Sequence, residues 1–147
     1  MSRTTRVMKC TPEDLFAVLE DGWSYGMWVV GAARIRDVDA AWPAPGSRIH
    51  HSVGAWPILL SDTTEVEQVE KPVMLRLRVR AWPTGEGRVT LTCKALGEGE
   101  TEVVMEEKAI GGPAALIPSP VENAILHARN VEALRRLAYL AENRARS

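Results

Sequence analysis

The feature that most constrains the fold is a long amphipathic segment, residues 119–143. Ser119 is a common type of N-cap, Pro120 is tolerated at the first helical position, and Glu122 completes a capping box. Apolar residues then recur at steps of three and four, which is the spacing of one helical face: Val121, Ala124, Ile125, Ala128, Val131, Leu134, Ala138 and Ala141. A helix of this length with one apolar face requires a broad apolar surface to pack on.

Segments of alternating apolar and polar residues precede this helix and can form that surface as a sheet. Strands are predicted over residues 3–10, 29–38, 47–54, 58–70, 73–82, 88–96 and 101–110. Most of the later separators are short and turn-like, so neighbouring strands are expected to be antiparallel. A helix capped by Thr11, with Pro12 at its first position, and a shorter helix over residues 23–28 follow the first strand. The order of elements is that of an α+β fold.

Length and charge exclude several classes of protein. The 147 residues are expected to form one domain, and the net charge of -1 argues against nucleic-acid binding. No apolar run approaches the ~18 residues that would span a bilayer, and the first residues lack the apolar core of a signal peptide. Cys10 and Cys93 form no motif with each other. A reducing, cytoplasmic location is therefore expected.

The alternation in residues 73–82 predicts which side of the sheet faces inward. Apolar residues share one face of this strand and arginines share the other: Leu75, Leu77 and Val79 against Arg76, Arg78 and Arg80. Pairing Glu65 with Arg78 and Glu67 with Arg76 would place opposite charges together on the solvent face. The same register turns three residues of the preceding strand inward: Asp62, Thr64 and Val66.

Three residues on the predicted inner face are polar, namely His51, Asp62 and Glu107. Two carboxylates and an imidazole are costly beneath a helix unless they are paired, hydrated or next to a cavity. A sheet that curves round a helix and keeps polar groups inside often encloses a pocket. We therefore predict a cavity between the sheet and the long helix.

Four stretches resemble the polyketide cyclase/dehydrase branch of the START-like, helix-grip superfamily (SRPBCC). They read TPEDLFAVLED (residues 11–21), WVVG (28–31), WPAPGS (42–47) and RNVEALRRL (129–137). The resemblance covers the whole chain and implies a single domain over residues 1–147, in which about seven curved antiparallel strands grip the C-terminal helix around a deep cavity. Members bind lipids, sterols, polyketides or other apolar molecules, and some catalyse cyclisation or dehydration. No family-wide catalytic motif maps onto these residues.

The leading interpretation is a protein that binds a small hydrophobic ligand, such as a lipid, a polyketide or another aromatic or isoprenoid molecule. One alternative is a polyketide cyclase or dehydratase, a lyase-like enzyme; the other is a lipid or quinone carrier that acts with a membrane or protein partner. No cofactor, metal or nucleic acid is expected, and the chain is expected to be a monomer or a weak homodimer.

The acid–base candidates of the enzyme hypothesis are His51, Asp62 and Glu107. His51 and Asp62 on neighbouring strands would form an imidazole oriented by a carboxylate, which suits proton transfer near neutral pH. A hydrogen-bonded structural pair is the alternative. Glu107 would be an acid whose pKa is raised by burial. Its structural alternative is a tie to the helix through His127, Arg129 or Asn130.

Residues predicted to contact the ligand come from the inner face of the sheet, from the segment at the expected cavity mouth and from the long helix. They are Trp23, Met27, Trp28, Ile49, His51, Asp62, Thr64, Leu77, Val79, Leu91, Cys93, Met105, Glu107, Ile125, Ala128 and Arg129. Ordinary core packing is the alternative for the apolar members. His50 and His51 are adjacent on one strand and point to opposite faces, so they do not form a chelating pair.

Overall fold

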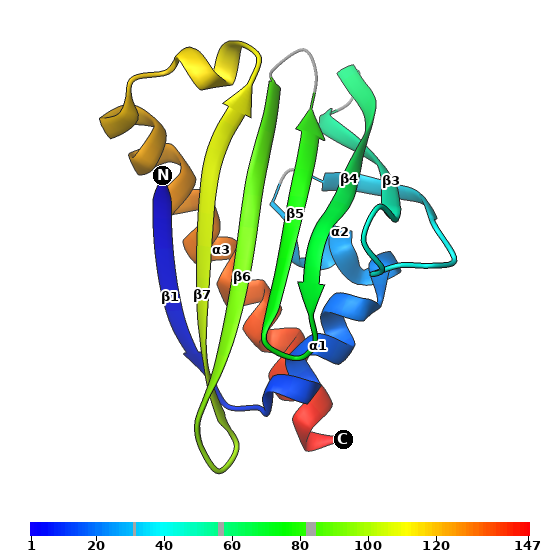
Figure 1. The fold of residues 1–147 in the computed structure, drawn as a ribbon, viewed down its shortest axis with the longest axis vertical. Coiled ribbons are helices and arrows are strands. Elements are labelled where there is room, and N and C mark those ends of the chain that lie inside the picture. The colour runs from blue at the N-terminus through cyan, green and yellow to red at the C-terminus, as the bar shows by residue number, and fades with distance from the viewer. Residues whose placement is uncertain (31, 56–57, 82–84) are drawn as a thin grey trace.

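The computed structural model describes the chain except for residues 31, 56–57 and 82–84 (Figure 1). Its elements, in order, are β1 (Ser2–Met8), α1 (Pro12–Glu20), the 3-10 turn η1 (Gly22–Ser24), α2 (Tyr25–Trp28), β2 (Ala32–Val38), β3 (Arg48–Ala55), β4 (Ile58–Glu70), β5 (Met74–Ala81), β6 (Gly85–Gly97), β7 (Glu100–Gly111), η2 (Pro113–Leu116) and α3 (Ser119–Arg146). The predicted range of β4 is reproduced, and the other described strands differ from prediction by a few residues at their ends.

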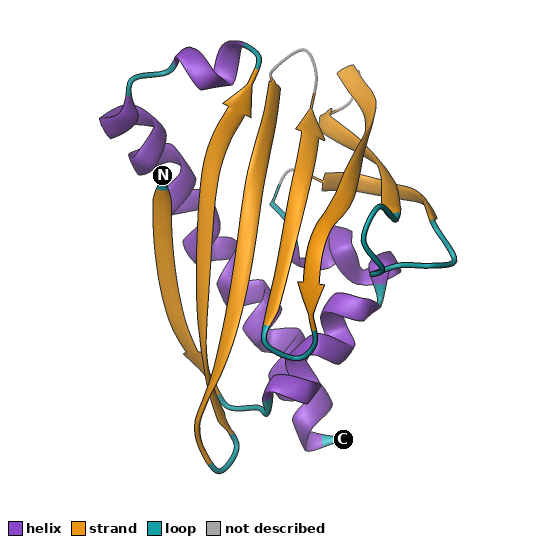
Figure 2. Cartoon of the chain, viewed as in Figure 1, coloured by secondary structure: helices purple, strands orange, loops and turns teal. Residues whose placement is uncertain are grey.

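The strands form one antiparallel sheet in the order β1-β7-β6-β5-β4-β3-β2. The long helix α3 crosses one face of this sheet, and α1 and α2 pack beside it (Figure 2). This arrangement confirms the predicted α+β, helix-grip fold. Among the described residues, no helix is both long enough and apolar enough to cross a membrane.

The register between β4 and β5 follows the prediction over half of its length. Thr64 pairs with Val79, and Glu65 with Arg78, as expected. A β-bulge after Val66 then shifts the register by one residue, so Gln68 pairs with Arg76. The predicted pairing of Glu67 with Arg76 is therefore wrong. Glu67 forms an ion pair with Arg88 of β6 instead, at 2.7 Å.

The two predicted helix starts have different outcomes. Thr11 caps α1 as predicted, because its hydroxyl accepts a hydrogen bond from the Asp14 backbone N–H at 3.1 Å. The capping box predicted for α3 is wrong. The helix begins at Ser119 itself, after Pro118, so the serine hydroxyl lies inside the first turn rather than before it. Glu122 lies 3.8 Å from the N-terminal amino group of Met1 instead.

The buried face of α3 matches the predicted face in part, because Leu134, Ala138 and Ala141 are buried as predicted. Its buried residues are Asn130, Ala133, Leu134, Leu137, Ala138 and Ala141, all from position 130 onward. Val121, Ile125 and Val131, which were predicted to face the sheet, are 50%, 56% and 44% exposed. The first half of α3 runs along the β1 side of the sheet, towards the end where η2 lies (Figure 1). The helix contacts β1, α1 and α2, and in its first half His127 and Arg129 contact Thr4 and Glu107 of the sheet, but its buried residues begin only at Asn130.

Candidate ligand-binding site

A buried polar cluster connects α2 to strands β3 and β4. The Thr64 Oγ1 atom lies 2.8 Å from the Tyr25 hydroxyl and 2.9 Å from the His51 Nε2 atom. The tyrosine ring is also stacked on the imidazole, with ring centroids 5.8 Å apart. All three residues are at most 3% exposed. Thr64 therefore holds the Tyr25 and His51 rings in place. The alternation of apolar and polar residues along β4 predicted that Thr64 points inward but did not indicate this role.

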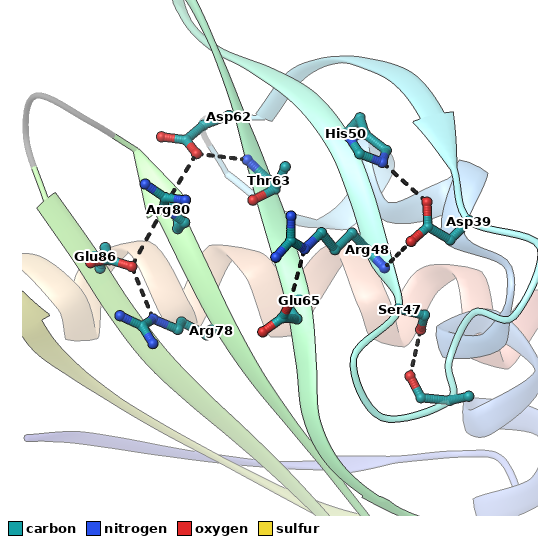
Figure 3. Close-up of polar contacts among 11 residues, drawn as sticks. Asp39, Ser47, Arg48, His50, Asp62, Thr63, Glu65, Arg78, Arg80 and Glu86 are labelled. Atoms are coloured by element: carbon teal, nitrogen blue, oxygen red, sulfur yellow. Dashed lines mark hydrogen bonds and ion pairs between the residues drawn. The ribbon is translucent and has the colours of Figure 1, made fainter.

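Asp62 does not orient His51 through a hydrogen bond. The two residues are cross-strand neighbours, as the predicted register requires. The Asp62 carboxylate accepts a hydrogen bond from the Thr63 backbone N–H at 2.9 Å and lies 3.7 Å from the Arg80 Nε atom (Figure 3). His51 Nε2 is bonded to Thr64, and within the described part of the chain Nδ1 has no hydrogen-bond partner. Burial lowers the pKa of His51, an effect that the negative charge of Asp62 opposes.

Replacing Thr64 with valine is expected to destabilise the fold. The change preserves shape but leaves the Tyr25 hydroxyl and the His51 Nε2 atom buried without a partner, and each such group costs about 1–3 kcal/mol. Urea unfolding measures the effect. Thr63→Val, at the next position of β4, is the matched control, because Thr63 lines the charged outer face instead. Equal losses in the two variants would contradict the structural role of Thr64.

The outer face of the sheet carries paired charges rather than an apolar site. A hollow of about 270 Å³ lies there, lined by Arg48, Thr63, Glu65, Arg78, Arg80 and Glu86. Arg48 pairs with Glu65 at 2.8 Å, and Arg78 pairs with Glu86 at 2.9 Å (Figure 3). Exposed ion pairs of this kind stabilise proteins weakly and offer no apolar surface to a ligand.

An ion pair joins β7 to α3 on the inner face of the sheet. The Arg129 Nη2 atom is 3.0 Å from the Oε2 atom of Glu107. Glu107 is 5% exposed, and its Oε1 atom has no hydrogen-bond partner among the described residues. Burial raises the pKa of Glu107, and the positive charge of Arg129 opposes that rise. Of the three predicted helix partners, Arg129 makes the ion pair, and the nearby Asn130 amide also favours the ionised carboxyl group and so opposes the rise in its pKa. His127 instead contacts Thr4 at 3.2 Å.

Two hollows meet at this ion pair. The outer one is a pocket of about 190 Å³, lined by Val79, Gly85, Glu86, Gly87, Glu107, Ala109, Ala114, Ile117, Glu122, Ile125, Leu126 and Arg129. The inner one is a cavity of about 20 Å³, lined by Tyr25, Trp28, Val29, Val30, Leu77, Val79, Val89, Met105, Glu107, Arg129, Asn130 and Ala133. Val79, Glu107 and Arg129 line both, so the ion pair is part of the partition between them.

These volumes correct the expectation of a deep cavity. Typical ligand pockets measure roughly 300–1,000 Å³, and a cavity of the inner one's size holds about one water molecule. Large side chains fill the space that the family resemblance implied would be open, among them Tyr25, Trp28 and Met105. The accessible pocket lies instead at one end of the sheet, beside η2 and the first half of α3.

The predicted ligand contacts divide into three groups. Seven line at least one of the two hollows: Trp28, Leu77, Val79, Met105, Glu107, Ile125 and Arg129. Five are buried but line neither described hollow: Ile49, His51, Thr64, Leu91 and Cys93. The other four lie outside both hollows; Trp23, Met27 and Ala128 are exposed, and Asp62 lies beside Arg80.

Several lining residues were not among the predicted ligand contacts, notably Gly87, Ala109, Ile117 and Asn130, although Asn130 was named as a possible partner of Glu107. A usable signal was present: Gly87 and Ala109 are small residues, and they pair across β6 and β7. Small side chains at neighbouring positions leave volume unfilled. Among the described residues, no group of three or more His, Cys, Asp and Glu side chains is arranged to hold a metal ion.

Stability is expected to depend on pH through Glu107. Its folded-state pKa is raised, so the folded protein binds more protons than the unfolded chain between the two pKa values. The stabilisation from this group is present at acid pH and is lost as the pH rises through the folded-state pKa. Urea unfolding of the wild type and Glu107→Gln should show the wild type losing stability relative to the variant from acid to neutral pH. A constant difference would contradict the raised pKa.

Comparisons with known proteins give a family and a set of structural neighbours. Residues 2–142 match the family model for polyketide cyclase/dehydrase and lipid transport. No match is found among curated proteins.

Solved structures share the fold over nearly the whole chain. The Zhui aromatase/cyclase from Streptomyces sp. R1128 has a TM-score of 0.73 at 16% identity, covering 99% of this chain and 94% of its own. A conserved protein from Geobacillus kaustophilus has a TM-score of 0.74 at 12% identity, covering 96% and 94%. A protein from Rhodobacter sphaeroides has a TM-score of 0.68 at 25% identity, covering 94% and 89%.

Proposed function

The chain belongs to the polyketide cyclase/dehydrase and lipid-transport family, and on that premise we propose that it binds a small hydrophobic molecule in the outer pocket. The ligand would lie between the ends of β5, β6 and β7 and the first half of α3. The Glu107–Arg129 ion pair would contact its inner end. This placement differs from a deep central cavity because the centre of this domain is filled by its own side chains.

The observation that carries the proposal is the uncovered apolar wall of the pocket. Ile125 is 56% exposed and Ile117 is 38% exposed, although both line a concave surface. Ala109 and Leu126 extend the same apolar wall. Covering such surface with a ligand gains roughly 25 cal/mol for each Å² of apolar area removed from water. The charged groups are confined to a few positions, as is usual for a site that orients an apolar molecule.

Native mass spectrometry of freshly purified protein, followed by extraction, tests the proposal directly. We expect a bound apolar molecule, or saturable binding of the neutral fluorescent probe N-phenyl-1-naphthylamine to protein that purifies empty. The stoichiometry should be one molecule per chain. A protein that purifies empty and binds no such probe would refute the proposal.

Catalysis is the second candidate function, and the position of Glu107 favours it. This carboxyl group is buried, has a raised pKa and lines both hollows, which are properties of a general acid. His51 and Asp62 lack this support because neither lines a described hollow. If the protein is a cyclase or dehydratase, Glu107→Gln should abolish turnover of a polyketide substrate while the substrate still binds. Turnover that persists in the variant would exclude Glu107 as the acid.

A further inference from the structure

The inner cavity combines apolar walls with unpaired polar atoms. Asn130 is 0% exposed and lies close enough to Glu107 for its amide to favour the ionised carboxyl group, but within the described residues neither its Oδ1 nor its Nδ2 atom has a partner at full hydrogen-bonding geometry. The Oε1 atom of Glu107 is in the same situation, and both residues line the cavity. Buried polar groups in folded proteins are almost always hydrogen-bonded. These atoms therefore indicate a place for a polar guest inside an otherwise apolar enclosure.

The size of the cavity limits the guest to a small polar group. About 20 Å³ is enough for one water molecule or for a ligand group of similar size. The other Glu107 oxygen, Oε2, is already paired with Arg129. It lies on the side of Gly87, which lines the outer pocket, at 3.5 Å from the position that a Cβ atom on Gly87 would occupy. A ligand in the outer pocket thus meets Oε2 and Arg129 first, and only its leading end reaches Oε1 and Asn130.

The chemistry of the unpaired atoms selects the kind of group. The Asn130 amide offers one donor group and one acceptor, and the unpaired Oε1 atom of Glu107 offers an acceptor. A hydroxyl both donates and accepts, so it can satisfy Glu107 and Asn130 together, as a water molecule would. A carboxylate has only acceptors, so it cannot donate to either of these oxygen atoms.

We infer that Glu107 and Asn130 form a hydroxyl-recognition site, so that the ligand is an uncharged apolar molecule with an alcohol or phenol at its inner end. This inference rests on the proposed function and specifies which polar group of the ligand the protein recognises. The apolar body occupies the outer pocket, and the hydroxyl passes the Glu107–Arg129 pair to reach the inner cavity. Fatty acids and other apolar carboxylates are selected against.

Three probes of matched shape test the inference: naphthalene, 2-naphthol and 2-naphthoate, titrated at neutral pH and followed by naphthyl fluorescence. The wild-type protein is expected to bind 2-naphthol roughly tenfold or more tightly than either of the others, because only the hydroxyl completes the buried hydrogen bonds. In Asn130→Leu, which removes the amide but preserves its approximate size, this preference should disappear. Asn143→Leu, on the exposed part of the same helix, is the matched control and should keep it.

The outcomes separate the inference from the proposed function. If either naphthalene or 2-naphthoate binds as tightly as 2-naphthol, the hydroxyl-recognition site is refuted. The proposal that the protein binds a hydrophobic molecule is not affected by that result. If Asn130→Leu keeps the wild-type preference, the assignment of the site to Asn130 is refuted. If none of the probes binds the wild type, both proposals fail. Glu107→Gln provides a second variant: it replaces one carboxyl oxygen with an amide group and should reduce the preference for 2-naphthol.

Discussion

Leu137→Ala is expected to lower the free energy of unfolding by about 2–5 kcal/mol, the usual cost of truncating a fully buried leucine. Leu137 is 0% exposed and lies on the half of α3 that packs against the rest of the core. Removing its isobutyl group loses the burial of that group and leaves a cavity that neighbouring side chains fill only in part. Urea unfolding followed by circular dichroism measures the loss.

Val131→Ala is the matched control for this prediction. Val131 is an apolar residue on the same helix, but it is 44% exposed. Its replacement is expected to change stability by about 0.5 kcal/mol or less, as is common for surface substitutions. Sequence periodicity had predicted Val131, and not Leu137, on the buried face. A larger loss for Val131→Ala than for Leu137→Ala would contradict the observed packing of α3.

Gly87→Leu is expected to weaken ligand binding by about tenfold to a hundredfold, because the new side chain would occupy the outer pocket. A Cβ atom at this position would lie 3.5 Å from the Glu107 Oε2 atom and 3.6 Å from the Lys108 backbone oxygen. Both distances are ordinary contacts, so the backbone should accept the substitution. Titration with N-phenyl-1-naphthylamine measures the change in affinity.

Gly97→Leu controls for the introduction of a leucine into β6. Among the described residues, a Cβ atom at Gly97 would meet nothing within 4 Å, and Gly97 does not line the outer pocket. This variant should bind the probe as the wild type does. If Gly87→Leu also binds normally while remaining folded, the ligand does not occupy the outer pocket.

Much of the fold was predictable because it depends on local patterns. Alternation placed Leu77 and Met105 on the inner face, and both are buried. The bulge that separates Glu67 from Arg76 was not predicted, although two consecutive polar residues between Val66 and Val69 interrupt the alternation of β4 at that point. The buried face of α3 was predicted correctly for Leu134, Ala138 and Ala141, but the exposed residues nearer its start were assigned to that face wrongly. Helical periodicity identifies apolar positions but does not say how far along the helix its partners extend.

The candidate site was predictable only in part. Burial of Glu107 followed from its place among inward-facing residues, and Arg129 was named among its helix partners. His51 and Asp62 were correctly placed as neighbours, but Thr64 and Arg80 compete for their hydrogen-bonding atoms. That competition depends on side-chain positions in three dimensions. The Asn130 amide was missed as a ligand contact because a polar residue within a helical pattern is usually exposed.

The sequence by itself determined the order of the elements, the antiparallel sheet and the polar groups at the centre of the domain, since these follow from spacings between nearby residues. Only the tertiary structure decided where a ligand can fit. A cavity is the volume that remains after side chains from distant segments have packed, and Trp28 and Met105 fill the centre whereas Gly87 and Ala109 leave the end open. The volume of such a cavity is the small difference between the space that the fold encloses and the space that its side chains fill, so it cannot be predicted from a local sequence pattern.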